Sequence, residues 1–172
     1  MVVGDAAPGF ALPKVRGGEL ELAKVLSETR AALVFYRGGW CPICNRQLAD
    51  ISNRYADFRA CNVAVLAISN EEVRQGKKVL AKVGPPYPLL LDSSSNVIAR
   101  YGLVAAKRDP LGWVLRKHEY AHPAVVLIGQ DSRIEWFYRG KNYRDRPTVD
   151  QILAAVRRTE KESEPDEGDQ QR

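Results

Sequence analysis

Two of the chain's three cysteines, Cys41 and Cys44, are separated by two residues in the segment FYRGGWCPIC. Two thiols at this spacing can open and close a disulfide, and the same spacing supplies half of many zinc sites. Three cysteines in 172 residues are too few for a disulfide-stabilised scaffold. The pair is therefore expected to be catalytic, redox-sensing or metal-binding.

The segments on either side predict where the pair lies. An apolar run at residues 31–37 predicts a buried strand that ends at two glycines, and apolar residues at spacings of three and four predict a helix over about 42–59. Pro42 suits the first helical position, where its missing amide hydrogen needs no partner. Cys41 then precedes the helix and Cys44 lies one turn inside. A helix N-terminus stabilises a thiolate, so both thiols are expected to ionise more readily than free cysteine.

Residues around the pair are expected to support it. Arg37 and Arg46 would add positive potential unless they point to solvent, and Trp40 would form an apolar lip. The two glycines before Trp40 would let a partner's backbone approach closely. Cys61 is expected to pack as a small apolar residue.

The rest of the chain alternates between strand and helix patterns. Further strands are predicted at residues 63–69, 124–128 and 133–138, and helices at 71–83, at 94–101 and after the N-cap Thr148, with Gln151 as its capping-box partner. Residues 103–122 have an irregular pattern. A strand, helix, strand unit implies parallel strands, and the turn GQDS favours an antiparallel hairpin. The sequence therefore predicts an α/β fold, with a central mixed β-sheet flanked by helices on both faces.

The net charge of +5 is unevenly distributed. Residues 159–172 hold six acidic and two basic residues and no large apolar side chain, so we predict a disordered acidic tail. The basic residues elsewhere are dispersed, and the cluster RGKNYRDR at 139–146 is interpreted as solvated surface. Nothing indicates nucleic-acid binding or a membrane span. The N-terminus lacks a signal-peptide pattern, and a cytoplasmic protein is expected.

The cysteine segment and the chain around it resemble a known family. FYRGGWCPIC resembles the active-site segment of thioredoxin-fold proteins, and residues 2–157 are similar to the peroxiredoxin-like branch of the AhpC/TSA superfamily. The similarity extends through GDAAPGFALP, PYPLLLDSSSNVIARYGL and GKNYRDRPTVDQIL. It implies a thioredoxin-like domain at residues 1–158, a disulfide or hydroperoxide substrate, an external thiol reductant of the thioredoxin or glutathione type, and no metal or organic cofactor. It also implies that Pro123 matches the cis-proline that faces the redox pair.

The resemblance assigns the two cysteines in two ways. Similarity to thioredoxin makes Cys41 the attacking thiolate and Cys44 the resolving thiol, whereas similarity to peroxiredoxin makes Cys44 the residue that attacks peroxide. In the second alignment Arg37, Cys41 and Pro123 replace a proline, a threonine and an arginine. Because that threonine and arginine polarise the peroxide, their replacement argues against fast peroxide reduction. We expect Cys41 to act in disulfide exchange because it is the more exposed, and Cys44 to act in any peroxide step.

Two other interpretations of the pair remain open. CxxC together with His118 and His122 offers a zinc ligand set, although the two halves are much farther apart than in a compact zinc finger. Alternatively, a non-catalytic thioredoxin-fold protein could use Trp40 and the groove at Pro123 to hold a partner. Metal content and partner capture by a cysteine-free variant distinguish these cases.

Overall fold

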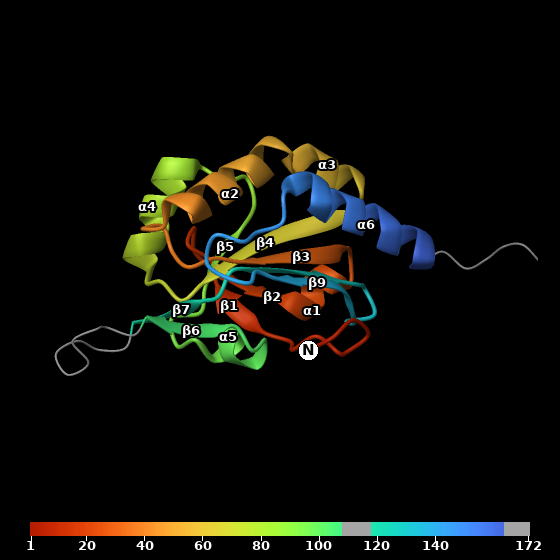
Figure 1. Cartoon of the computed structure of the whole chain (residues 1–172), viewed down its shortest axis with the longest axis horizontal. Coiled ribbons are helices and arrows are strands. Elements are labelled where there is room, and N and C mark those ends of the chain that lie inside the picture. Colours follow the sequence, from red (N-terminus) through yellow and green to blue (C-terminus); the bar gives the residue numbers. More distant parts are fainter. Residues whose placement is uncertain (108–117, 164–172) are drawn as a thin grey trace, which may run out of the picture.

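The computed structural model describes residues 1–107 and 118–163 of the chain. Its centre is a five-stranded sheet with the strand order β5-β4-β3-β8-β9 (Figure 1). The strands are β3 (Arg30–Phe35), β4 (Val63–Ser69), β5 (Leu89–Leu91), β8 (Ala124–Ile128) and β9 (Ile134–Arg139). Strand β4 is parallel to β3 and β5, whereas β8 is antiparallel to both β3 and β9. The predicted mixed sheet, with its parallel unit and its hairpin, is confirmed.

Two short antiparallel ribbons lie beside this sheet. One pairs β1 (Ala11–Pro13) with β2 (Glu19–Glu21), and the other pairs β6 (Val104–Lys107) with β7 (His118–Ala121). The prediction of an irregular stretch at 103–122 is therefore wrong at both of its ends. Segments of three or four residues carry too little periodicity to be recognised, and pairing with a partner strand defines them instead. Residues 108–117 lie outside the described residues.

Helices cover both faces of the sheet, as predicted (Figure 1). The alternation of β3 divides the core, because Ala32 and Val34 point to one face and Leu33 and Phe35 to the other. Helices α2, α3, α4 and α6 pack on the first face, and α1 and α5 pack on the second. The helices are α1 (Leu22–Leu26), α2 (Pro42–Asn53), α3 (Tyr55–Ala60), α4 (Val73–Val83), α5 (Asn96–Arg100) and α6 (Val149–Ser163).

The single helix predicted over 42–59 is two helices in the structure. Helix α2 ends at Asn53 and α3 begins at Tyr55, because Arg54 has non-helical backbone angles of φ −112° and ψ 15°. The Arg54 side chain binds Asp57 and, at 3.0 Å, Asp150 at the start of α6. The apolar stripe continues across the break, with Ile51 and Phe58 in the same core. Spacing alone therefore gave no sign of the interruption.

Helix α6 confirms its predicted start and extends past its predicted end. The Gln151 amide donates to the Thr148 hydroxyl, and the Gln151 side chain accepts from the Thr148 amide, which is the predicted capping box. The helix continues to Ser163, although a tail was predicted from residue 159. Thr159 is buried, and Arg30 donates to its hydroxyl. This contact holds the last turns of α6 on the sheet, and residues 164–172 lie outside the described residues.

The ion pair between Arg30 and Glu135 ties the beginning of β3 to β9 and α6. The two side chains are 12% and 15% exposed and their closest atoms are 2.6 Å apart. We expect Glu135→Ala to lower the free energy of unfolding by about 3 kcal/mol, because it leaves a largely buried guanidinium without its carboxylate. Urea denaturation measures this change. The control is Glu21→Ala, which removes an exposed partner of Lys24 and should cost less than about 1 kcal/mol. Equal losses of unfolding free energy in the two variants would contradict the assignment of this stabilisation to the buried ion pair.

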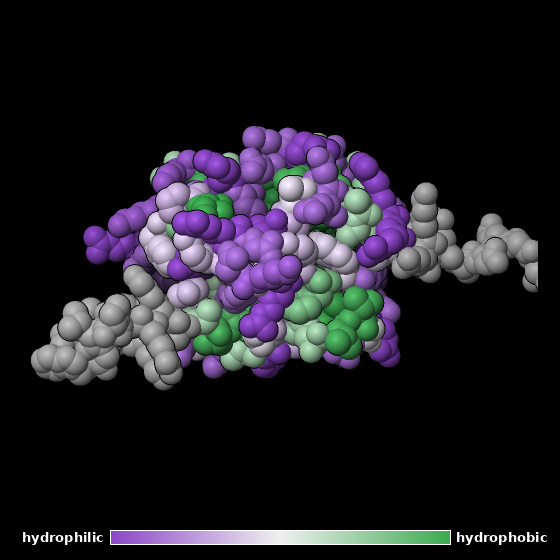
Figure 2. All heavy atoms as spheres, in the orientation of Figure 1, coloured by the Kyte–Doolittle hydropathy of each residue, from purple (hydrophilic) through white to green (hydrophobic). Residues whose placement is uncertain are grey.

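The surface in the orientation of Figure 1 is mostly hydrophilic. Figure 2 shows an apolar patch at its lower right, near the place of the N-terminus in Figure 1, and Val2 and Val3 are more than half exposed. Within the described ranges, no helix combines the length and the apolar character that a bilayer crossing needs.

Candidate active site

The cysteine pair lies where β3 gives way to α2, as predicted. Cys41 is the N-cap residue, with an extended backbone, and Pro42 occupies the first turn. The Asn45 amide donates to the Cys41 carbonyl at 3.1 Å, which begins the helix. Both thiols are free, with Cys41 3% and Cys44 0% exposed. Cys41 is the more exposed of the two, as expected, but the difference is small. Access to either sulfur therefore requires a ligand that reaches into the site.

Tight packing shapes the loop before Cys41. Gly38 has a φ of +140°, and a Cβ there would lie 2.5 Å from the Trp40 ring nitrogen. The Gly39 amide donates to both carboxylate oxygens of Glu71, at 2.9 and 3.0 Å, and the Asn45 side chain donates to the Gly39 carbonyl at 2.8 Å. The sequence assigned these glycines to the approach of a partner. In the structure they let the chain's own loop close.

Replacing Gly39 should therefore disturb the pair without touching it. A Cβ at this position would lie 2.4 Å from a methyl carbon of Val79 on α4. We expect Gly39→Ala to shift the loop, to lower the rate of disulfide exchange by roughly tenfold and to cost about 1–3 kcal/mol in the free energy of unfolding. The control is Gly9→Ala, where a Cβ meets open space. If Gly39→Ala behaves like Gly9→Ala, the loop does not position the pair.

The environments of the two sulfurs differ. The thiol of Cys44 donates to Cys41, and this is the main cause that lowers the pKa of Cys41 to about 5 against the cost of burial. The Cys44 amide and the charges of Arg146 and Arg37 act in the same direction. The pKa of Cys44 is raised, because its thiol donates to Cys41 and because burial disfavours its charged form. At neutral pH the pair therefore holds one proton and one negative charge, with the charge on Cys41.

Arg146 reaches this pair from the segment between β9 and α6. Its Nη2 donates to the Cys44 sulfur at 3.1 Å, and its Nη1 donates to the Gln47 side chain at 2.6 Å. The interpretation of residues 139–146 as solvated surface is therefore wrong for Arg146. The sequence contained one signal for it, because Arg146 lies in the family segment GKNYRDRPTVDQIL, but nothing there predicted a contact with Cys44.

Arg37 lies in a cage of three aromatic rings. Its guanidinium carbon is 4.6 Å from the ring centre of Trp40, 4.4 Å from Tyr120 and 4.8 Å from Tyr143. The rings come from the loop before Cys41, from β7 and from the segment before α6, so one cation joins three parts of the chain. Arg37 contributes to the lowered pKa of Cys41, as expected from the sequence. Trp40 is 59% exposed and forms the outer wall of the cage.

Pro123 does not have the geometry that the resemblance implied. It is buried directly before Ala124, which pairs with Phe35 at the end of β3. No peptide bond is cis in the parts of the chain that the structure describes, so the cis assignment of Pro123 is wrong. The trans form is the intrinsically preferred one before proline as elsewhere. Pro123 therefore lies on the same edge of the sheet as the cysteine loop, in the ordinary backbone geometry.

The structure offers no zinc site among the side chains it describes. His122 shares a hydrogen bond with the Gly140 carbonyl through Nε2, at 2.7 Å. Where side chains are described, no three His, Cys, Asp or Glu residues gather as metal ligands. The His118 side chain lies outside the described residues, although its backbone belongs to β7. Cys61 is partly buried against the core that contains Cys41 and Cys44.

The fold and the paired thiols define a redox protein of the thioredoxin fold. The chain belongs to the AhpC/TSA family, whose profile matches residues 3–137. Thiol-disulfide oxidoreductase ResA of Halalkalibacterium halodurans is 26% identical over 101 residues, which are 58% of this chain and 56% of ResA. Peroxiredoxin Bcp of Escherichia coli is 25% identical over 132 residues, which are 77% of this chain and 81% of Bcp.

Solved structures agree with the fold. The crystal structure of peroxidoxin BcpB from Mycobacterium tuberculosis superimposes with a TM-score of 0.76 at 25% sequence identity, and the match covers 92% of this chain and 97% of BcpB. The predicted thioredoxin-like α/β fold and the family assignment are thus confirmed. The chain spans little more than half the length of ResA and most of the length of the peroxiredoxins.

Proposed function

We propose that the protein is a thiol-dependent antioxidant oxidoreductase in which Cys41 and Cys44 alternate between the dithiol and the disulfide. The observation that carries this proposal is the pair itself, buried at the N-terminus of α2, where hydrogen bonds from Cys44 and the charges of two arginines lower the pKa of Cys41. The family of the chain, which includes peroxiredoxins and thiol-disulfide oxidoreductases, supports the same chemistry. Trp40, Pro42, Arg37 and Pro123 support the pair and take no part in bond making.

In thiol-disulfide exchange, Cys41 is the attacking residue. Its thiolate attacks one sulfur of a substrate disulfide, forms a mixed disulfide and releases the other half of the substrate as a thiolate. Cys44 then loses its proton, attacks the Cys41 sulfur and releases the second half. The substrate is reduced to two thiols, and the protein ends with a Cys41–Cys44 disulfide. The lowered pKa of Cys41 supports this order of attack.

A second candidate reaction is hydroperoxide reduction at Cys44, and the contact with Arg146 favours it. Cys44 would first pass its proton to the Cys41 thiolate. The Cys44 thiolate would then attack the peroxide O–O bond and take the terminal oxygen as a sulfenic acid, and the leaving oxygen would take a proton and depart as an alcohol or water. Cys41 would then displace water and close the disulfide. Peroxiredoxins have an arginine at the position of Pro123. Arg146 would take over the role of that arginine, because its guanidinium lies 3.1 Å from the Cys44 sulfur. Such a cation stabilises the charge that develops on the leaving oxygen.

Both reactions leave a disulfide that an external thiol must reduce. We propose a reductant of the thioredoxin or glutathione type and a cytoplasmic location, because a disulfide cycle of this kind depends on a pool of reduced thiols.

Stopped-flow measurements on the reduced protein separate the two reactions. The protein is mixed in single turnover with cumene hydroperoxide or with the linear disulfide 2-hydroxyethyl disulfide, and quenched samples are analysed by mass. We expect a mixed disulfide at Cys41 in Cys44→Ser with the disulfide, and a sulfenic acid at Cys44 in Cys41→Ser with the peroxide. A wild-type protein that forms no Cys41–Cys44 disulfide with either oxidant would contradict the proposal.

A further inference from the structure

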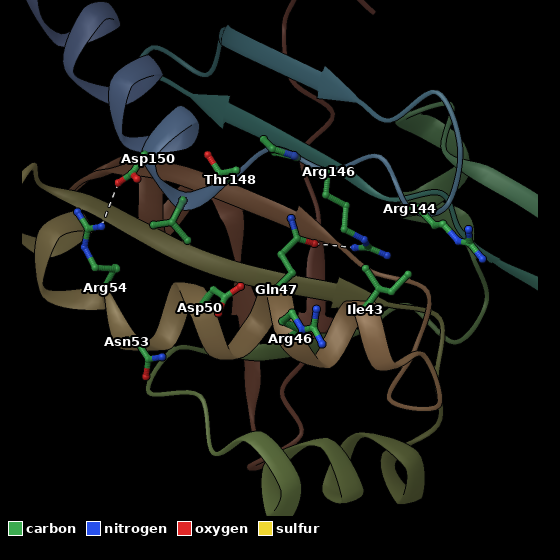
Figure 3. Close-up of a pocket in the computed structure, with 12 residues that line it drawn as sticks. Ile43, Arg46, Gln47, Asp50, Asn53, Arg54, Arg144, Arg146, Thr148 and Asp150 are labelled. Carbon is green, nitrogen blue, oxygen red and sulfur yellow. Dashed lines mark hydrogen bonds and ion pairs between the residues drawn. The ribbon is translucent and has the colours of Figure 1, made fainter.

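Two hollows are lined by residues that neighbour the cysteine pair in the chain, and their net charges are opposite. One of about 440 Å³ is lined by Arg37 and Trp40 and carries three acidic side chains, Glu71, Glu72 and Glu119. The other, of about 460 Å³, is a groove between α2 and the segment at residues 144–150 (Figure 3). Both volumes lie in the range of small-molecule sites. The groove is lined by four arginines, Arg46, Arg54, Arg144 and Arg146, and by two carboxylates, Asp50 and Asp150.

The arginines of the groove differ in what they bind. Arg54 at one end is neutralised by Asp57 and by Asp150, and Figure 3 shows the pair with Asp150. Within the described residues, Arg46, Arg144 and Arg146 form no ion pair with a carboxylate. The groove therefore has an end neutralised by carboxylates, and its other three arginines are opposed by one further carboxylate, Asp50, which leaves an excess of positive charge at this cationic end. An anionic ligand would bind at the cationic end.

The cationic end is also the end that meets the redox pair. In Figure 3 Arg146 and Gln47 point toward each other above α2, with Ile43 beside them and the Arg54–Asp150 pair at the opposite end. The same Arg146 guanidinium that bonds Gln47 also donates to the Cys44 sulfur at 3.1 Å. A ligand held here by its negative charges would lie beside Arg146, whose guanidinium contacts the buried Cys44 sulfur.

We propose that this groove, called the arginine groove, binds a low-molecular-weight thiol that carries two carboxylates and reduces the Cys41–Cys44 disulfide. The proposal rests on the function proposed above and names the reductant's chemical class. Arg46 and Arg144 bind the carboxylates, and the ligand's sulfur lies toward Arg146. The acidic hollow on the other side repels such a ligand, so charge directs the thiol to one face of the pair.

The reduction takes two exchange steps. The ligand's thiolate attacks one sulfur of the disulfide, forms a mixed disulfide and displaces the other cysteine as a thiolate. A second thiolate of the same kind attacks the ligand's sulfur in the mixed disulfide, forms the ligand disulfide and releases the remaining cysteine. Two thiols are oxidised to one disulfide. One of their two protons passes to Cys44 and the other passes to solvent, because Cys41 stays a thiolate at neutral pH. Displacement of Cys41 is favoured, because a thiolate of low pKa leaves readily.

The test compares two thiols on the oxidised full-length protein. Mercaptosuccinate carries two carboxylates and 2-mercaptoethanol carries none, and loss of the Cys41–Cys44 disulfide is followed by mass after acid quenching. We expect the double variant Arg46→Gln/Arg144→Gln to lower the ratio of the mercaptosuccinate rate to the 2-mercaptoethanol rate by about tenfold. The control, Arg100→Gln/Arg133→Gln, removes the same charge from exposed positions outside the groove and should leave the ratio unchanged.

Four results would overturn the proposal. An equal fall in the control would show that net charge, and not the groove, attracts the thiol. A ratio unchanged in the groove variant, with a slower reaction with thioredoxin, would assign the arginines to a protein reductant. Failure of the wild-type protein to form the disulfide at all would contradict the proposed function as well. If each thiol reduces the disulfide at the same rate in the groove variant as in the wild type, only the groove proposal is contradicted.

Discussion

Cys41→Ser is expected to lower the rate of disulfide reduction by more than about 1,000-fold, because a serine hydroxyl cannot supply the thiolate that attacks. Cys44→Ser should stop the cycle one step later. It keeps the attacking thiolate and lacks the thiol that resolves the mixed disulfide, so the mixed disulfide should accumulate at Cys41. Single-turnover assays with mass analysis of the quenched protein measure both effects.

The chain provides its own control for these two variants. Cys61→Ser changes a thiol that is partly buried against the same core but is not paired, and its rates should stay within about twofold of wild type. Retained activity in the Cys41→Ser/Cys44→Ser double variant would contradict the catalytic role of the pair. Equal capture of a partner by that double variant would support the non-catalytic alternative.

Arg146→Gln is expected to lower peroxide reduction by roughly 100-fold. Glutamine can still bond Gln47, but it removes the positive charge that lies 3.1 Å from the Cys44 sulfur. The pKa of Cys41 should rise at the same time, because Arg146 is one of the charges that lower it. Stopped-flow rates with cumene hydroperoxide and the pH dependence of alkylation measure the two effects separately.

A role of Arg146 that is merely structural would give a different pattern. Arg146→Lys keeps the charge and should recover part of the peroxide rate and most of the lowered pKa. Arg133→Gln removes a charge that is 63% exposed and far along the chain from the pair, and should leave both unchanged. If Arg146→Lys and Arg146→Gln are equally impaired and neither moves the pKa, Arg146 does not act through its charge.

The sequence predicted the parts of the fold that have strong local signals. The long apolar runs of β3, β4 and β8 and the capping box of α6 were recognisable without any tertiary information. The position of Cys41 at a helix N-terminus followed from Pro42 and the preceding glycines in the same way. These features depend on residues that are neighbours in the chain, so the sequence contains their cause.

The sequence could not predict features that depend on distant contacts. Arg146 is 102 residues from Cys44, and the three rings around Arg37 come from separate segments. The sequence placed Thr159 in an acidic tail. Its hydrogen bond with Arg30 requires β3 and α6 to pack together, and local composition does not reveal that packing. Arg54, at the break between α2 and α3, likewise contacts Asp150, which lies 96 residues further along the chain. In each case a charged or polar side chain contacts a residue that is distant in the sequence.

The pH dependence of alkylation tests the central claim, which is that the fold holds a thiolate at Cys41. Iodoacetamide reacts with the thiolate, so its rate with reduced Cys61→Ser protein, followed by mass at Cys41, reports the ionisation of that residue. We predict a rate that reaches half of its plateau near pH 5 and is constant from about pH 6.5 to 8. A rate that keeps rising up to pH 8.5, as with free cysteine, would contradict the account.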